Sequence, residues 1–194
     1  MTIAYRLGNA LYLNITNKCP CNCRFCIRDS QEGVNPGESL WLPHEPSLTE
    51  ILDALSEINF KEYSEIVFCG YGEPTERLDV LLECARAFEG CLPVRVNTNG
   101  LSDLINGKKT APLLAEHVNA VHISLNAPDA DSYNDVCRPV FGEGSFEALI
   151  QFAKDCRECI PEVKLTVVRH TLDDESVEKC RRLCEDLDIP LRVR

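Results

Sequence analysis

The chain has 194 residues, a length that suits one domain with a sizeable hydrophobic core. Its net charge of −11 disfavours nonspecific binding to nucleic acid or to an anionic membrane. The N-terminus shows no apolar signal segment and no stretch is long enough to cross a bilayer, so we expect a cytoplasmic protein. In that compartment the 12 cysteines are reduced, and those grouped at ligand spacing predict a metal site rather than disulfides.

Short β-branched runs alternate with segments of helical period, the pattern of βα units around a parallel sheet. A capping-box pattern at Ser47 and Glu50 marks the first helix, and a long loop before it, at 30–46, has Trp41 as its one large apolar anchor. Six strands predict a single α/β domain over residues 1–194, an open, partial (β/α)6 TIM-like barrel with parallel strands. The strands are predicted at 11–16, 65–69, 94–98, 120–125, 163–168 and 191–194, and the helices at 51–58, 74–90, 110–116, 146–153 and 177–187.

The run Cys19-Pro-Cys-Asn-Cys23-Arg-Phe-Cys26 follows the first predicted strand with C-x3-C-x2-C spacing. Three thiolates this close on a loop can hold an iron–sulfur cluster, but they satisfy only three of the four irons in a cubane. A cluster that only carries electrons normally has four cysteines, whereas catalysis needs an open metal position. The motif therefore predicts a catalytic cluster on Cys19, Cys23 and Cys26.

Unusual residues follow the second predicted strand, at the sheet edge where such folds place their chemistry. Gly70 and Gly72 carry no side chains that would keep a ligand from the backbone. Pro74 holds Glu73 extended, so its carboxylate would project from the rim and could accept hydrogen bonds from an ammonium group. The alternative is a carboxylate that only stabilises the first turn of the next helix.

Polar residues also mark the ends of the third and fourth predicted strands. Asn97 and Asn99 lie two apart, as do Ser124 and Asn126, so each pair shares one face of its strand. Buried parallel strands are normally apolar on both faces, so a bound ribose or carboxylate would explain these pairs. The alternative is a hydrogen-bonded polar layer inside the barrel with no ligand.

The same alternation turns basic residues toward the interior. His122 shares the inward face with Ser124, and Arg192 and Arg194 alternate with apolar neighbours on the last strand. A basic interior in an acidic protein predicts a substrate with a carboxylate or phosphate, held by Arg192 or Arg194. The alternatives are ion pairs with glutamates at the base of the barrel and, for His122, a satisfied core histidine.

These motifs together resemble the radical S-adenosylmethionine (radical SAM) superfamily. The resemblance rests on the cysteine motif, with Phe25 before its last cysteine, and on Tyr71-Gly-Glu-Pro74. Across the whole chain, through segments 40–42, 68–75, 97–101, 124–128 and 137–139, the sequence is similar to the TatD-family-associated radical SAM proteins. The resemblance implies two cofactors, a [4Fe–4S] cluster and S-adenosylmethionine at its open iron. One electron would cleave the latter to a 5′-deoxyadenosyl radical, which abstracts hydrogen from an unidentified small-molecule or nucleotide-related substrate.

The resemblance also implies roles for single residues. Glu73 and its neighbours would hold the methionine amino group, Arg138 would pair with a carboxylate, and Phe25 and Val168 would lie near the adenine. A reducing donor such as flavodoxin or ferredoxin would supply the electron. The residues implied to bind S-adenosylmethionine are Phe25, Gly70, Tyr71, Gly72, Glu73, Asn97, Asn99, Ser124, Asn126, Arg138 and Val168.

The remaining cysteines fall into two groups. Cys69 and Cys137 adjoin rim motifs, and either could be a catalytic thiol that donates or accepts a hydrogen atom. The other group has helical spacing and could form a second metal site, and the extra Cys21 could also bind a second metal. Three cysteines of the helical group fall on the apolar stripes of their helices, however, where a buried cysteine serves as a small hydrophobe. This group consists of Cys156, Cys159, Cys180 and Cys184.

Two other functions are compatible with the cysteine motif. One is an activase that generates a radical on a partner protein. The other is a non-catalytic iron–sulfur or zinc module, the zinc held by the four cysteines between residues 19 and 26. Zinc sites usually pair two separated ligand knuckles, whereas this chain shows one, and such a module leaves Glu73 and Asn97 unexplained.

Overall fold

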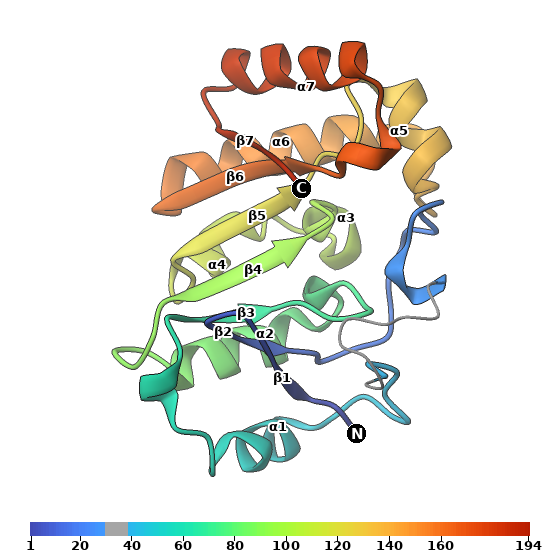
Figure 1. Cartoon of the computed structure of the whole chain (residues 1–194). Coiled ribbons are helices and arrows are strands. Elements are labelled where there is room, and N and C mark those ends of the chain that lie inside the picture. Colours follow the sequence, from blue (N-terminus) through green and yellow to red (C-terminus); the bar gives the residue numbers. More distant parts are fainter. Residues whose placement is uncertain (30–38) are drawn as a thin grey trace.

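The computed structural model describes residues 1–29 and 39–194. In this part of the chain, seven strands form one sheet in the order β1-β2-β3-β4-β5-β6-β7 (Figure 1). β2 to β7 pair in parallel, and β1 pairs antiparallel with β2. Because β1 and β7 are the two edges of the sheet, the barrel is open, which confirms the predicted partial barrel. The strands are β1 (Ala4–Leu7), β2 (Ala10–Leu13), β3 (Glu65–Phe68), β4 (Val94–Thr98), β5 (Ala120–Ser124), β6 (Glu162–Val167) and β7 (Leu191–Val193).

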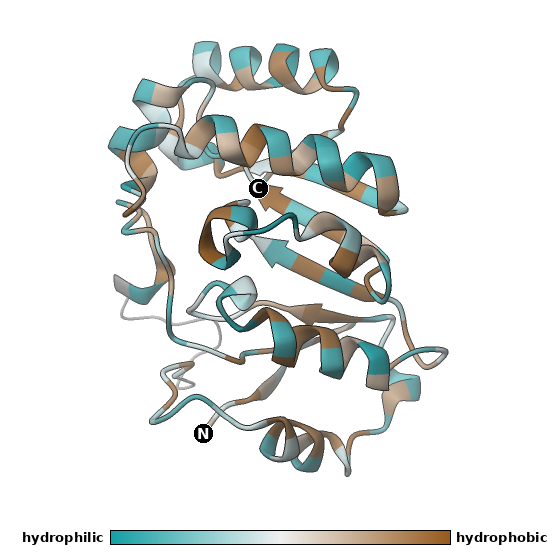
Figure 2. Ribbon diagram, turned by 180° about the vertical axis from the view of Figure 1, so that it is seen from behind, coloured by the Kyte–Doolittle hydropathy of each residue, from teal (hydrophilic) through white to brown (hydrophobic). Residues whose placement is uncertain are grey.

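The helices carry both hydrophilic and hydrophobic residues, and their apolar sides join the sheet in one main core (Figure 2). Among the described residues, no helix combines the length and the apolar character needed to cross a membrane. The α-helices are α1 (Leu48–Leu55), α2 (Leu78–Ala87), α3 (Ser102–Asn106), α4 (Ala111–Ala115), α5 (Ala130–Cys137), α6 (Ser145–Cys159) and α7 (Asp174–Asp186). Short 3-10 helices lie at Ile27–Asp29, Phe60–Glu62, Pro74–Arg77 and Arg169–Thr171.

β1 is absent from the prediction, as are the helices α3 and α5. Gly8 adopts a left-handed backbone, with φ of +61°, in the turn that joins β1 to β2. A Gly-Asn pair between two apolar runs is a hairpin signal, and Gly8 with Asn9 fits it. The hairpin brings Tyr5 and Leu7 to the cavity described below.

The glycines after β3 serve the packing of the backbone. A Cβ atom on Gly70 would lie 2.0 Å from Oδ1 of Asn14. A Cβ atom on Gly72 would lie 2.3 Å from the carbonyl oxygen of Thr16 and 2.7 Å from that of Lys18. The two glycines therefore allow the segments that follow β2 and β3 to approach each other closely, a reason that the sequence prediction did not give.

Residues 30–38 of the predicted long loop lie outside the described part of the chain. From residue 39 onward, the loop is held to the end of β2 by hydrogen bonds. Asn14 Nδ2 donates to the carbonyl oxygen of Leu40 at 2.7 Å. Asn17 donates to the carbonyl oxygen of Leu42 at 2.7 Å and accepts from its N–H at 3.1 Å. Leu40 and Leu42 are buried, whereas Trp41 is 51% exposed, so the prediction of Trp41 as the anchor was wrong. Side chains alternate in an extended segment, so Leu40 and Leu42 point to one face and Trp41 points to the other.

Candidate functional site

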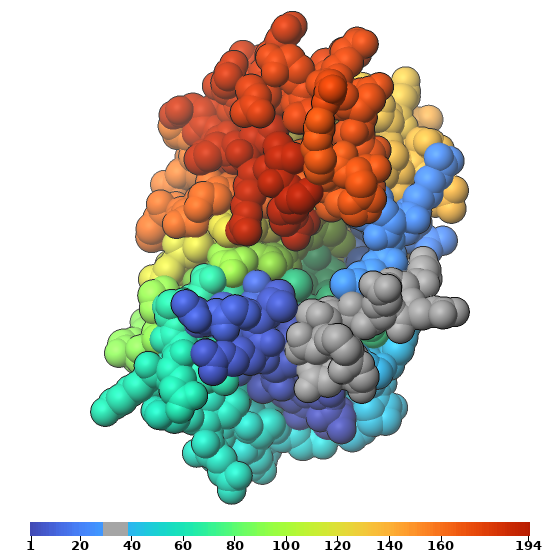
Figure 3. All heavy atoms as spheres, in the orientation of Figure 1, coloured from blue at the N-terminus to red at the C-terminus, as the bar shows by residue number. Residues whose placement is uncertain are grey.

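A cavity of about 510 Å³ opens at the carboxyl ends of the strands. It is lined by the cysteine loop, by the residues that follow β3 to β7, and by the N-terminal hairpin. The space-filling view shows the surface hollowed between N-terminal residues in blue and C-terminal residues in red (Figure 3). The lining residues are Tyr5, Leu7, Tyr12, Cys19, Cys21, Cys23, Phe25, Cys26, Ile27, Cys69, Gly70, Asn97, Asn99, Ser124, Asn126, Val168 and Arg194.

The three predicted cluster ligands, Cys19, Cys23 and Cys26, all line this cavity as free thiols. Hydrogen bonds from the neighbouring thiols of Cys137 and Cys21 hold the pKa of Cys23 below its ordinary value. Thiolate is the form of cysteine that binds metal, so this environment favours ligation.

The three cysteines of the motif face one cavity from a single loop. Across residues 1–29 and 39–194, no three His, Cys, Asp or Glu side chains gather at the separation of ligands to one metal ion. A [4Fe–4S] cluster makes a different demand, because each cysteine binds a different iron. Three free thiols from one loop, facing one cavity, fit that demand.

Asn126 gives an independent indication that the cavity accepts a ligand. It is 5% exposed, and its Oδ1 has no hydrogen-bond partner among the described residues. Its Nδ2 donates to the sulfur of Cys137 at 3.7 Å, which orients the amide. An unpaired buried acceptor costs about 1–3 kcal/mol, so a ligand hydroxyl or amino group at this oxygen would recover that energy.

Glu73 does not project from the rim, so that prediction was wrong. The residue is 3% exposed, and burial raises the pKa of its carboxyl group. The carboxylate accepts hydrogen bonds from Thr75 N at 3.1 Å, Thr75 Oγ1 at 2.8 Å, Thr98 Oγ1 at 2.8 Å and Asn99 N at 2.6 Å. It caps the 3-10 helix Pro74–Arg77 and ties it to the end of β4, which agrees with the alternative of a first-turn carboxylate.

Several other predicted site residues lie away from the cavity lining. Tyr71 is buried edge-on against Trp41, with ring centroids 5.2 Å apart. Cys137 is fully buried, and Arg138 is an exposed residue at the end of α5 with φ of +48°. The predicted site residues outside the lining are Tyr71, Gly72, Glu73, His122, Cys137, Arg138 and Arg192.

The inward basic residues of β4 and β5 are hydrogen-bonded to glutamates. Arg95 pairs with Glu65 at 2.7 Å, and it donates to Asn97 Oδ1 at 2.6 Å. His122 places Nδ1 3.3 Å from Arg95 Nη1 and Nε2 3.2 Å from Glu162. These contacts agree with the alternative of ion pairs at the base of the barrel, and His122 is a satisfied interior histidine rather than a cavity residue.

The environment of His122 predicts a loss of stability in mild acid. Burial lowers the pKa of His122, with Arg95 and Lys164 adding to the effect and Glu162 opposing it. In the unfolded chain this histidine binds a proton near pH 6.5, whereas in the folded chain it stays unprotonated to a lower pH. The free energy of unfolding therefore falls as the pH drops below about 6.5. We expect the free energy of unfolding, measured with urea at several pH values, to fall by up to about 1.4 kcal/mol per pH unit through this residue.

The variant His122→Gln removes this titration while it keeps one acceptor and one donor. Its unfolding free energy should depend less on pH below about 6.5 than that of the wild type. The exposed His170 is the matched control, and His170→Gln should retain the wild-type slope. Equal slopes for the two variants would contradict the assignment.

Four cavity residues had no place in the sequence prediction: Tyr5, Leu7, Tyr12 and Ile27. The Tyr5 hydroxyl donates to the carbonyl oxygen of Cys69 at 3.1 Å, and its ring lies 5.2 Å from that of Tyr12. The signal that could have found Tyr5 and Leu7 is the Gly-Asn turn after them, which predicts a hairpin.

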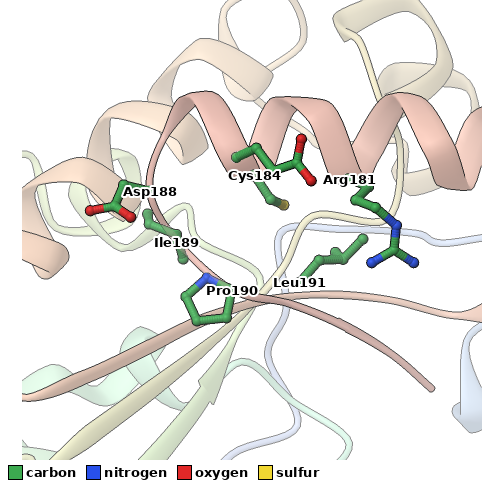
Figure 4. A pocket seen from close by; sticks show the side chains of 7 residues that line it. Arg181, Cys184, Asp188, Ile189, Pro190 and Leu191 are labelled. Atoms are coloured by element: carbon green, nitrogen blue, oxygen red, sulfur yellow. The ribbon is translucent and has the colours of Figure 1, made fainter.

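The cysteines at helical spacing are mostly core residues. Cys156, Cys180 and Cys184 are buried within the main core, as their apolar stripes predict. Cys159 is exposed and donates from its thiol to the carbonyl oxygen of Asp155 at 3.2 Å. A second hollow, of about 420 Å³, lies between α7 and β7, with Cys184 on its wall, and it holds none of the residues predicted for the site (Figure 4).

Comparisons with known proteins agree with this geometry. Residues 13–184 match the model of the radical SAM superfamily. Among solved structures, the chain is similar to TYW1 with a lysine-pyruvate adduct bound (18% identity, TM-score 0.60). It is also similar to Streptococcus suis SuiB bound to S-adenosylmethionine (20% identity, TM-score 0.68). A third is the methyltransferase TsrM from Kitasatospora setae, with cobalamin and a [4Fe–4S] cluster bound (15% identity, TM-score 0.59).

These structures share the fold over nearly all of this chain but extend beyond it. The chain is covered to 96%, 95% and 91%, and it spans 65%, 40% and 35% of TYW1, SuiB and TsrM, respectively. No curated protein matches the sequence. The family match covers the cysteine motif and the strands β3 to β6, and it does not support the interpretation as a zinc module. The chain therefore belongs to the radical SAM superfamily, a family of enzymes that use a [4Fe–4S] cluster and S-adenosylmethionine.

Proposed function

We propose that this protein cleaves S-adenosylmethionine reductively at a [4Fe–4S] cluster and abstracts hydrogen from a small-molecule substrate in the same cavity. When bound, the cluster supplies the electron for cleavage, and the 5′-deoxyadenosyl radical that results is the hydrogen acceptor. The observation that carries the proposal is one cavity lined by Cys19, Cys23 and Cys26 together with Asn126, whose buried Oδ1 has no hydrogen-bond partner among the described residues. The motifs at 68–75 and 137–139 support a place among the TatD-family-associated members, and the cysteine usage supports a cytoplasmic location.

The protein would hold S-adenosylmethionine mainly through residues on the cavity wall. Gly70 lines the cavity, whereas the Glu73 carboxylate is turned away from it. The segment from Gly70 to Glu73 would therefore bind the methionine amino group through backbone groups. Phe25 and Val168 supply apolar walls that suit an adenine ring.

Polar side chains that line the same cavity suit the hydroxyl and carboxylate groups of the cofactor. Asn97, Asn99, Ser124 and Asn126 all line the cavity, at the ends of neighbouring strands. Asn99 is held by its N–H to Glu73 at 2.6 Å, so its position is fixed before a ligand binds. Such preorganisation lowers the entropic cost of binding.

Cys69 is the better placed of the two thiols predicted to be catalytic. It lines the cavity directly after β3, whereas Cys137 does not. Burial raises the pKa of Cys69, so the thiol keeps its hydrogen at neutral pH. An S–H group facing the substrate suits a hydrogen-atom donor.

Arg194 supports the proposal that the substrate is an anion. It lines the cavity near Cys69, and no ion pair neutralises it within the part of the chain that the structure describes. Arg192, two residues earlier in β7, does not reach the lining. A guanidinium that faces a cavity without a carboxylate partner suits the carboxylate or phosphate of a ligand.

The variant Arg194→Gln should weaken the binding of an anion by about tenfold or more, because a charge-assisted hydrogen bond contributes about 1.5–3 kcal/mol. Titration of inorganic phosphate and of a small dicarboxylate, followed by calorimetry, measures the effect. Arg192→Gln is the matched control and should bind as the wild type does. Equal affinities of the two variants would argue against an anion clamp at Arg194.

The activity itself is tested under anaerobic conditions. The protein is reconstituted with iron and sulfide, S-adenosylmethionine and dithionite are added, and 5′-deoxyadenosine is quantified. Product formation by a brown, cluster-loaded protein supports the proposal. A cluster-loaded protein that forms no product, alone or with candidate substrates, would overturn it.

A further inference from the structure

Cys137 is a buried thiol to which the proposed function gives no role. It is the last residue of α5, it is fully buried, and it does not line the cavity. A substrate in the cavity would therefore not meet this thiol, whereas it would meet Cys69. The neighbours of Cys137 indicate what the thiol does instead.

The backbone on both sides of Cys23 is hydrogen-bonded to the end of α5. Asn22 N–H donates to the carbonyl oxygen of Cys137 at 3.1 Å. Arg24 N–H donates to the carbonyl oxygen of Val136 at 3.0 Å. Because Asn22 and Arg24 flank Cys23 in the sequence, these two hydrogen bonds hold the backbone of Cys23 beside that of Cys137. The cysteine loop and the end of α5 are thus fixed relative to each other by the protein itself.

The side chains of the two cysteines meet as well. The thiol of Cys137 forms a hydrogen bond with the sulfur of Cys23, and this contact contributes most to the lowered pKa of Cys23. The same contact, followed by burial, raises the pKa of Cys137. Cys137 therefore keeps its hydrogen and is the donor, and the sulfur of Cys23 is the acceptor.

The sulfur of Cys137 is at the same time an acceptor. Asn126 Nδ2 donates to it at 3.7 Å, and Asn126 lines the cavity. A chain of hydrogen bonds therefore runs from an amide at the cavity, through the buried thiol of Cys137, to the predicted cluster ligand Cys23. Successive hydrogen bonds in such a chain polarise one another, so the amide N–H strengthens the S–H group as a donor.

We propose that Cys137 is a positioning residue that donates a hydrogen bond to the sulfur of Cys23 in the cluster-bound protein and thereby raises the reduction potential of the cluster. The inference rests on the proposed function, in which Cys23 binds iron. A reduced cluster places more negative charge on its sulfur ligands, so a donor at the sulfur stabilises the reduced form more than the oxidised form. The reductant loses one electron, the cluster gains it, and the proton stays on Cys137.

A second buried cysteine separates this role from simple packing, because a buried cysteine can serve only as a small hydrophobe. Cys156 on α6 is also fully buried in the main core and does not line the cavity. The groups that act on its pKa, apart from burial, are Cys159, Asp103 and Asp155, none of which belongs to the cysteine loop. Replacing Cys156 with alanine removes the same sulfur atom from the same core without touching a cluster ligand.

The test is an anaerobic redox titration of the cluster-loaded protein in the absence of S-adenosylmethionine, with the reduced cluster measured by electron paramagnetic resonance. Cys137→Ala should make the potential more negative, because it disfavours one-electron reduction by about three- to tenfold, or about 30–60 mV. Cys156→Ala should keep the wild-type potential. Cys137→Ser retains a hydroxyl donor at this position, so its potential should lie closer to that of the wild type than to that of Cys137→Ala.

Stability provides the control for packing. Both alanine variants should lower the free energy of unfolding of the metal-free protein, because each leaves a small cavity in the core. Only Cys137→Ala should also change the potential. A residue that merely fills space would lower the stability and leave the potential where it is.

Two results would overturn the positioning role. One is a potential of Cys137→Ala equal to those of Cys156→Ala and the wild type. The other is a potential of Cys137→Ser shifted as far as that of Cys137→Ala, since the hydrogen-bond donor would then not be the cause. A wild type that binds no cluster would overturn this inference together with the proposed function. A cluster that shows the expected shift but forms no 5′-deoxyadenosine would overturn the proposed function alone.

Discussion

Replacing Cys23 with alanine should abolish cluster binding and, with it, all formation of 5′-deoxyadenosine. Cys23 faces the cavity, and its environment favours the thiolate that binds iron. A cubane held by three cysteines has no spare protein ligand, so losing one should reduce the retained iron and sulfide by about tenfold or more. Iron and sulfide analysis and the visible absorbance of the reconstituted protein measure this loss. Cys19→Ala and Cys26→Ala should behave in the same way.

Cys21 provides the control within the same loop. It lines the same cavity and lies beside Cys19, but it is not part of the C-x3-C-x2-C spacing. Hydrogen bonds with the thiols of Cys19 and Cys23, and then burial, raise the pKa of Cys21, which disfavours the thiolate form. Cys21→Ala should therefore keep the cluster. If it loses iron as Cys23→Ala does, then Cys21 is a ligand and the open iron position is in doubt.

The sequence predicted the order of strands and the position of the site well, because both depend on local patterns. The alternation of apolar runs with helical segments is typical of βα units, and each parallel strand ends at the same edge. The residues that reach the cavity from this edge include Cys69, Asn97, Ser124 and Val168. Their strand ends could be predicted without any knowledge of packing.

The direction of individual side chains could not be predicted from these patterns. Glu73 turns away from the cavity because two backbone N–H groups, of Thr75 and Asn99, need an acceptor at that point. Arg95 and His122 contact Glu65 and Glu162, respectively, from neighbouring strands. These partners are far apart in the chain, so only the register of the sheet brings them together.

Strand alternation could not decide whether Arg192 or Arg194 reaches the cavity. Arg192 lies in β7 and Arg194 directly follows the strand, and only Arg194 lines the cavity at the carboxyl end. Alternation assigns a face and not a depth along the strand. The depth follows from the pairing of Thr166 with Arg192, which places Arg192 within the sheet rather than at its rim.

Glu73→Ala should destabilise the fold strongly, because the carboxylate is the acceptor for four donors in a buried place. The hydroxyl groups of Thr75 and Thr98 can rotate toward other acceptors, but the N–H groups of Thr75 and Asn99 cannot. Each buried donor left unpaired costs about 1–3 kcal/mol, so we expect a loss of about 2–5 kcal/mol in the free energy of unfolding. Urea denaturation of the metal-free protein measures it without the contribution of the cluster.

Glu73→Gln sharpens the test because it keeps the shape and removes the charge. One side of the amide can still accept, but the other becomes a donor that faces an N–H group, either that of Asn99 or that of Thr75. It should therefore lose stability as well, although less than Glu73→Ala does. Glu76→Ala is the control from the same 3-10 helix, because Glu76 is only half-buried and its carboxylate accepts no hydrogen bond within the described residues. If the free energies of unfolding of Glu73→Ala and Glu76→Ala differ by less than about 0.5 kcal/mol, the Glu73 carboxylate is not a structural acceptor. That result would support the original prediction that this carboxylate binds the methionine amino group directly.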